Sequence, residues 1–190
     1  DFFRKKESSG GNHSFNGQRY SMAAFCLWQY HLITRIDDAA RTEVSSLLPN
    51  IHFPFALTAH LFWSKNIQEE RDAPHQILFG SMDPKNCLFI ALAIHLESRI
   101  QHDNGRLASQ YLFDINRNSK PENTKALVRT WMKNVFESSE YIAKHGDVAR
   151  QLSSSHSLRK LPSTQVCMNG CSREDIATRG LWRLCNGMLW

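Results

Sequence analysis

Apolar side chains recur every three to four residues in several parts of the chain, which is the spacing of one face of an α-helix. The first such stretch begins at Ser21, whose hydroxyl can cap the first turn. A second follows Asp83-Pro84, which we interpret as an N-cap and a first-turn proline. A third covers residues 125–144. Each of these predicted helices carries an apolar stripe. The first stripe consists of Met22, Phe25, Leu27, Trp28, Leu32 and Ile33, the second of Leu88, Phe89, Leu92 and Leu96, and the third of Leu127, Trp131 and Val135.

Two more helices are predicted nearer the C-terminal end of the sequence. One begins at His156 after a capping Ser155 and ends at Asn169-Gly170, because glycine readily adopts the left-handed conformation that closes a helix. Pro162 lies inside this helix, where a lost hydrogen bond predicts a kink. The pattern Ser172-x-x-Asp175 resembles a capping box and predicts a last short helix.

Alternating apolar and polar residues predict a small sheet between the first two helices. Pro49 and Pro54 interrupt helical structure there, and residues 57–65 alternate as a half-buried strand does. Residues 76–80 form a second candidate strand, which the charged turn 66–74 separates from the first. We therefore predict a mainly α fold with a small antiparallel β-sheet.

Composition narrows the class of protein. The 190 residues are 42% hydrophobic and 11% aromatic, which excludes a wholly disordered chain. Residues 1–20 are polar and rich in glycine and serine, so we interpret them as a linker or mobile arm and residues 21–190 as one domain. The 23 Lys and Arg residues against 18 Asp and Glu give a net charge of +5. This charge agrees with a polyanionic partner but is weak evidence by itself.

Several features bear on where the protein works. No apolar run approaches the ~20 residues that cross a bilayer, and the first residues lack the apolar segment of a signal peptide. The odd number of cysteines, five, favours a reducing compartment. We therefore expect no membrane partner and no secretion, with the protein in the nucleus if it is eukaryotic and in the cytoplasm otherwise.

The cysteines also permit a metal site. Cys26 and Cys87 lie in apolar stretches, which is typical of buried free thiols. Cys167, Cys171 and Cys185 could bind zinc together with His156, but the spacing of the four residues matches no standard zinc motif. We favour the interpretation that Cys167, Cys171 or both pack in the core.

His156 and Arg159 are the most informative polar pair. They lie three residues apart at the start of a predicted helix and so share a face, where free backbone N–H groups favour an anion. An arginine can hold two oxygens of a phosphate in its planar fork, and a histidine can add a third hydrogen bond. The sequence contains neither a glycine-rich phosphate loop nor the serine elbow of the α/β-hydrolases.

Other segments extend this pair into an ordered set. Thr34-Arg35-Ile36-Asp37-Asp38 places a carboxylate three residues after an arginine, and the predicted strand ends in Trp63-Ser64-Lys65-Asn66. His156-x-x-Arg159 is followed by Asn169-Gly170 and then by Arg179-Gly180-Leu181-Trp182. This order, over residues 21–190, resembles the catalytic domain of the tyrosine recombinase (phage integrase) family. The amino-acid sequences of these segments are most similar to family members from eukaryotic mobile elements of the Crypton kind.

The resemblance implies a function and a role for each residue. Family members cut duplex DNA by attack of a tyrosine oxygen on a backbone phosphate, need no metal or cofactor, and usually act as homo-oligomers on DNA. Arg35 and Arg159 would bind the phosphate oxygens on which charge develops. His156 would add a hydrogen bond or handle a proton, Lys65 would protonate the leaving oxygen, and Trp182 would donate its indole N–H. We expect Asp38 to be structural, orienting Arg35 or a neighbouring helix.

One element of the family pattern is missing from these residues. No tyrosine follows Trp182, and Tyr20, Tyr30, Tyr111 and Tyr141 all precede the His156-x-x-Arg159 box. We therefore expect a domain that is truncated just before its nucleophilic tyrosine. Two alternatives stay open, a non-catalytic DNA-binding relic of a mobile element and a helical zinc-binding module.

Overall fold

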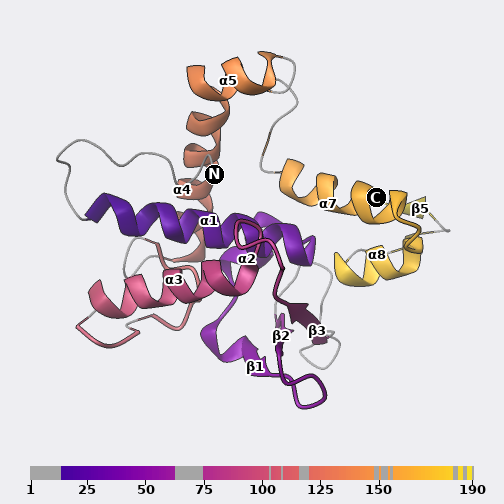
Figure 1. The fold of residues 1–190 in the computed structure, drawn as a ribbon, viewed down its shortest axis with the longest axis horizontal. Helices are drawn as coiled ribbons and strands as arrows, with labels where there is room; N and C mark the ends of the chain where they lie inside the picture. Colours follow the sequence, from indigo (N-terminus) through magenta and orange to yellow (C-terminus); the bar gives the residue numbers. More distant parts are fainter. Residues whose placement is uncertain are drawn as a thin grey trace.

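The fold is mainly helical, with a small three-stranded antiparallel sheet, as the sequence predicts (Figure 1). The computed structural model describes residues 14–62, 75–102, 104–107, 109–115, 120–147, 150, 154, 156–181, 184–185 and 188–189. Its helices are α1 (Ser14–Leu32), α2 (Ile36–Ala40), α3 (Leu88–His102), α4 (Pro121–Phe136), α5 (Ser139–His145), α7 (Ser157–Met168) and α8 (Arg173–Arg179), with a 3-10 turn η1 (Val44–Ser46). Its strands are β1 (Leu47–Pro49), β2 (Ala56–His60), β3 (His75–Phe79), β4 (Leu184–Cys185) and β5 (Met188–Leu189).

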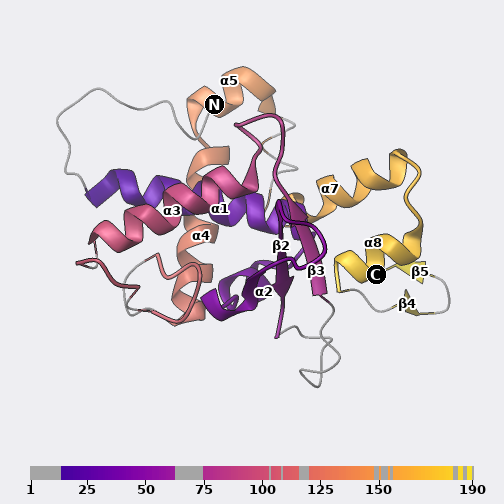
Figure 2. The same ribbon diagram turned by 60° about the horizontal axis from the view of Figure 1, so that its bottom comes forward.

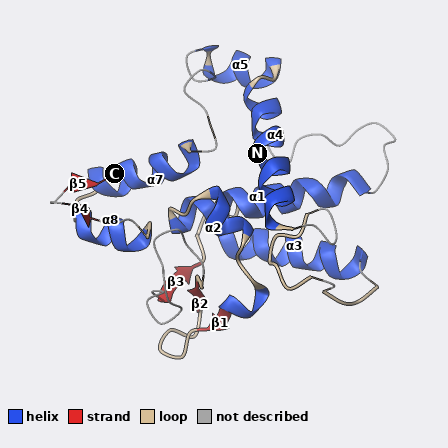
Figure 3. Cartoon of the chain, turned by 180° about the vertical axis from the view of Figure 1, so that it is seen from behind, coloured by secondary structure: helices blue, strands red, loops and turns tan. Residues whose placement is uncertain are grey.

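Helix α1 runs through the middle of the molecule and contacts both α3 and α7 (Figures 1 and 2). Helix α2 packs on α4, and α8 packs on α7. The sheet has the order β1-β2-β3, and Thr58 of β2 pairs with Leu48 on one side and with Ile77 on the other. Seen from behind, β1, β2 and β3 gather at one side of the helices, while β4 and β5 lie beside α8 (Figure 3).

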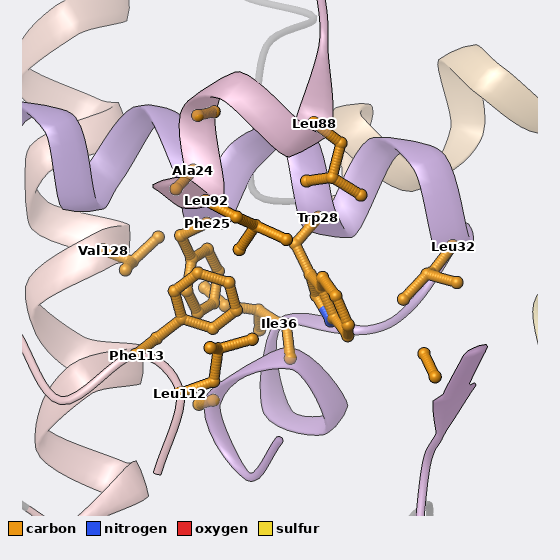
Figure 4. Packing of buried hydrophobic residues seen from close by; sticks show 14 of the residues in the cluster. Ala24, Phe25, Trp28, Leu32, Ile36, Leu88, Leu92, Leu112, Phe113 and Val128 are labelled. Carbon is orange, nitrogen blue, oxygen red and sulfur yellow. The ribbon is translucent and has the colours of Figure 1, made fainter. Parts of the chain in front are cut away.

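The core forms around the apolar face of α1. Phe25 and Trp28 are fully buried, and both pack edge-on against Phe113, with ring centroids 5.1 and 5.9 Å away (Figure 4). Leu88 and Val128 close over them from α3 and α4 (Figure 4). Burying a large apolar side chain contributes roughly 1.5–3 kcal/mol, so α1 holds three other segments of the chain together.

A buried histidine fixes the segment before α4 against α3. His95 accepts a hydrogen bond at Nδ1 from the Ser21 hydroxyl (2.9 Å), and its Nε2 donates to the Leu112 carbonyl (2.7 Å), since a carbonyl can only accept. Arg99 donates from Nη1 to the same carbonyl (2.8 Å). Burial lowers the pKa of His95 to about 4, so the ring is neutral and both of its nitrogens have partners.

Several predicted boundaries are wrong. Helix α1 begins at Ser14 rather than Ser21, so its first turns lie in the stretch interpreted as a linker. Asp83-Pro84 opens a turn instead of α3, because the Asp83 carboxylate accepts from the backbone N–H of Lys85 (3.0 Å) and from Asn86, and α3 starts only at Leu88. The single helix predicted over 125–144 is two helices, because the Ser138 hydroxyl caps a new one by accepting from the Tyr141 N–H (3.2 Å).

The predicted end of α7 and the predicted cap of α8 are confirmed. Gly170 has φ +87°, and the N–H groups of Gly170 and Cys171 bond back to the carbonyls of Cys167 and Val166, which is the predicted glycine end of α7. Ser172 caps α8 by accepting from the Asp175 N–H (3.0 Å), as the capping box predicts. Helix α7 continues through the buried Pro162 to Met168, and its N-cap is His156. Ser155 lies outside the described residues.

We expect His95 to make stability depend on pH. Its pKa is about 4 in the folded state against about 6.5 when unfolded, so the unfolded chain binds more protons between these values and stability falls as pH drops through this window. The full effect is about 3 kcal/mol. Urea unfolding at pH 7 and pH 4.5 should therefore show a larger loss for the wild type than for His95→Gln, which can keep both hydrogen bonds. An equal loss in the two proteins would contradict this assignment, and the exposed His52→Gln is the matched control.

Candidate anion site

A strained turn at the end of α1 places Arg35. Ile33 is buried with φ +54°, a left-handed conformation that is unfavourable for a β-branched residue. The Thr34 N–H bonds back to the Gln29 carbonyl (3.2 Å), which closes α1 and turns the chain sharply into α2. Arg35 is therefore the N-cap of α2 and lies two residues after the strained Ile33. Strain of this kind persists where the surrounding structure holds it, commonly at functional sites.

Asp38 anchors the start of α2. Its carboxylate accepts from the Arg35 backbone N–H (3.2 Å), so it satisfies one of the free donors at the helix start. Asp38 is only 2% exposed. Burial raises its pKa to about 6, against the opposing effects of that N–H and of the positive charges of Arg35 and Arg159. The expectation that Asp38 has a structural role is consistent with this hydrogen bond.

Arg159 reaches the same place from the first turn of α7. Its Nη2 donates to the Gly180 carbonyl (2.8 Å), which ties the start of α7 to the end of α8. Burial and the charge of Arg35 lower the pKa of Arg159 to about 10, while Asp38 acts in the opposite direction. Arg35, Asp38 and Arg159 are thus electrostatic neighbours, although they come from distant parts of the sequence.

The charges in this cluster do not balance. Two half-buried guanidinium groups lie near a single carboxyl group, Asp38, whose own pKa is raised so that its neutral form is favoured. Within the part of the chain that the structure describes, the buried Nη1 of Arg35 and Oδ1 of Asp38 make no hydrogen bond. A buried polar group without a partner costs about 1–3 kcal/mol. The arrangement therefore suits an anion that can accept from the arginines.

The other predicted site residues are placed as follows. His156 is the exposed N-cap of α7, on the same turn as Arg159. Among the described contacts, none joins its imidazole to either guanidinium group. Lys65 and Trp182 lie outside the described residues. Gly180, two positions before Trp182, contacts Arg159 through its carbonyl.

Arg179, which opens the Arg179-Gly180-Leu181-Trp182 motif, is a structural residue. Its Nε donates to the His31 carbonyl (3.1 Å), and its Nη1 donates to the Gln76 side chain (2.9 Å) and to the Ile77 carbonyl (3.0 Å). These bonds join α8 to the end of α1 and to β3. Burial lowers its pKa. No sequence signal distinguishes this arginine from Arg159, because the partners of each side chain depend on how α7 and α8 pack.

The zinc alternative loses its predicted ligand set. His156 and Cys167 stand at opposite ends of α7, about 16 Å apart at 1.5 Å per residue, too far to share an ion. Cys167 and Cys171 are exposed free thiols, so the expectation that either packs in the core is wrong. Cys26 and Cys87 are buried free thiols, as predicted. Across the described ranges, no group of three or more His, Cys, Asp or Glu side chains could hold a metal ion.

The chain was also compared with known proteins. No family model, no curated protein and no solved structure matches it. Separately, none of the helices in the described ranges has the length and apolar character needed to span a membrane. What bears on function is therefore the geometry of the site and the resemblance in the sequence.

We expect Asp38→Asn to change how stability depends on pH. The Asp38 pKa is about 6 when folded and 3.8 when unfolded, so the folded state binds more protons in between, and this group lowers stability as pH rises through that window. The full effect is about 3 kcal/mol. The free energy of unfolding of Asp38→Asn minus that of the wild type should therefore be larger at pH 8 than at pH 4. Chemical unfolding at both pH values measures this difference. A stability difference that does not change with pH would show that the Asp38 carboxyl group is not perturbed by the fold.

Proposed function

We propose that this domain binds the backbone phosphates of duplex DNA through Arg35 and Arg159, as the catalytic domain of a tyrosine recombinase-type DNA breaking and rejoining protein. The observation that carries the proposal is the pairing of two arginines from separate segments around one buried carboxyl group. Like charges held together in this way are most easily explained by a ligand that brings negative charge.

The phosphodiester is the anion that fits best. It has two free oxygens, and each guanidinium group can donate to them through its planar fork. In the transition state of strand cleavage these oxygens gain negative charge. Two arginines already held in position would therefore stabilise the transition state more than the bound, uncut DNA. The net charge of +5 supports a polyanionic partner.

The remaining family positions complete the proposal. His156, on the first turn of α7 with Arg159, would donate to the phosphate or handle a proton. Lys65 would protonate the departing 5′-oxygen, and Trp182, two positions after Gly180 in the sequence, would donate its indole N–H. These three roles come from the resemblance alone.

The nucleophile would come from outside these 190 residues. No tyrosine follows Tyr141 in the sequence. Tyr30 lies on α1, and its hydroxyl donates to the side chain of Gln165 (2.7 Å). A domain that binds DNA without cutting it, a relic of a mobile element, would use the same two arginines. Covalent chemistry therefore separates the two forms of the proposal.

We expect weak duplex binding that falls steeply with salt. Without sequence contacts, the Kd should be about 10⁻⁴–10⁻⁶ M, because phosphate contacts release condensed counterions. Arg35→Ala and Arg159→Ala should each weaken binding about tenfold and reduce the salt slope by about one. Fluorescence anisotropy with a labelled duplex at two salt concentrations measures both quantities.

Two controls make this experiment specific. Lys133→Ala removes an exposed charge on α4, far along the sequence from either arginine, and should change binding little. Arg159→Lys keeps the charge but loses the fork, so it should weaken binding less than Arg159→Ala and leave the salt slope close to that of the wild type. Because Arg159 also bonds to Gly180, each variant is first checked by thermal unfolding. Folded arginine variants that bind DNA like the wild type would contradict the proposal.

Covalent attachment tests the catalytic half of the proposal. The 190-residue chain should form no adduct with a nicked suicide duplex, because charge-stabilising groups cannot replace a nucleophile. A chain extended by its natural downstream residues should attach if they supply a tyrosine, and Arg159→Ala should abolish the adduct. A denaturing gel scores the protein–DNA band. A band from the 190-residue chain itself would mean that one of its own four tyrosines is the nucleophile.

A further inference from the structure

A groove of about 550 Å³ is lined by residues of α1, α3, α5 and α7 and of the turn before α3. Its floor includes Ala23, Cys26 and Leu27 of α1, and its walls include Ile94 of α3 and Leu158 of α7. This volume is within the ~300–1,000 Å³ that small-molecule sites occupy. Phe25 and Trp28, which point into the core (Figure 4), do not line the groove. Neither Arg35 nor Arg159 lines it.

The floor of the groove is apolar and chemically inert. Cys26 is buried, and burial raises the pKa of its thiol to about 12. The thiol therefore stays protonated and behaves as a small hydrophobic group. Together with Ala23, Leu27, Ile94 and Leu158, it offers a surface for a hydrocarbon chain or ring.

The charge at the groove has one sign. Lys85 reaches it from the turn before α3, and Lys144 reaches it from α5. His31, also at the groove, bonds through Nε2 to the Asn86 carbonyl (3.1 Å). Of the residues that the structure describes, no Asp or Glu lines the groove. Lys144 is exposed and makes no ion pair within the described part of the chain. Its ammonium group can therefore meet an incoming anion.

We propose that this groove binds a small amphipathic anion, an apolar chain or ring that ends in a carboxylate. The apolar part lies on the floor formed by α1, and the carboxylate pairs with the lysines at the rim. Two kinds of complementarity support this occupant. An apolar body removes the floor from water, and the carboxylate meets a rim where the described lining residues include two lysines and no Asp or Glu. The inference goes beyond DNA binding and does not depend on it.

Decanoate is a suitable probe. Decyltrimethylammonium, which has a hydrocarbon chain of similar length and the opposite charge, is the control probe. Isothermal titration of the whole 190-residue chain should show binding of decanoate and at least tenfold weaker binding of the cation. Lys144→Glu should weaken decanoate binding about tenfold, because an attraction becomes a repulsion of similar size. Lys120→Glu, an exposed lysine outside the groove, is the matched control and should leave binding unchanged.

A second variant tests the apolar part of the site. Ala23→Trp fills the floor and should abolish decanoate binding, with circular dichroism to show that the variant is folded. If Ala23→Trp does not fold, Lys144→Glu and the two probes decide alone. Equal binding of the two probes, or decanoate binding that Lys144→Glu leaves unchanged, would overturn the proposal. Duplex binding of the same variants is measured in parallel and should match the wild type, so failure here is distinct from failure of the DNA proposal.

Discussion

Helix α1 contacts α3 along one side and α7 along another, and the position of each arginine follows from this packing. Arg35 comes two residues after Ile33, at the strained turn that ends α1. Arg159 is on the first turn of α7, which lies against α1. The burial of Phe25 and Trp28 fixes α1 in the core. The free energy gained there is what keeps two like charges together, because their mutual repulsion opposes the arrangement.

Because core packing holds these groups together in spite of their repulsion and burial, the pKa values of Asp38 and Arg159 are shifted. Asp38 is buried near both arginines, yet burial raises its pKa to about 6 in spite of their positive charges. Arg159 is lowered to a pKa of about 10. Each group is therefore less stable in its charged form than it is in water. A bound anion would relieve this cost at Arg159 and would favour the neutral form of Asp38, which is why we infer a binding site and not only a structural ion pair. Arg179 shows the contrast, since carbonyl oxygens and the Gln76 side chain accept its hydrogen bonds.

The parts of the fold that local sequence signals control could be predicted. The mainly helical class, the strands around Leu57 and Leu78, the Gly170 end of α7 and the Ser172 cap of α8 depend on periodicity or on a single capping residue. Strand β1 was missed because three residues that end in Pro49 are too few to show a period. The break at Ser138 was missed because apolar spacing continues across it, and only the cap reveals the new helix.

In the candidate site, too, some features could be predicted from the sequence and others could not. The residue types of Arg35 and Arg159 suggested an anion site, but their proximity depends on the packing of α1, α2 and α7, which no local signal encodes. The raised pKa of Asp38 and the structural role of Arg179 depend on burial, and burial is a property of the whole fold. The roles proposed for Lys65, His156 and Trp182 remain predictions from the sequence.

The central claim is that Arg35 and Arg159 hold one and the same phosphate. A double-mutant cycle on duplex binding tests it most directly, with affinities of the wild type, Arg35→Ala, Arg159→Ala and the double variant measured at one low salt concentration. Groups that share a ligand are coupled, so the double variant should lose less than the two single losses added together, by about 1 kcal/mol or more. Losses that add within about 0.5 kcal/mol would mean that the two arginines meet separate phosphates, and the account of a single site would be wrong.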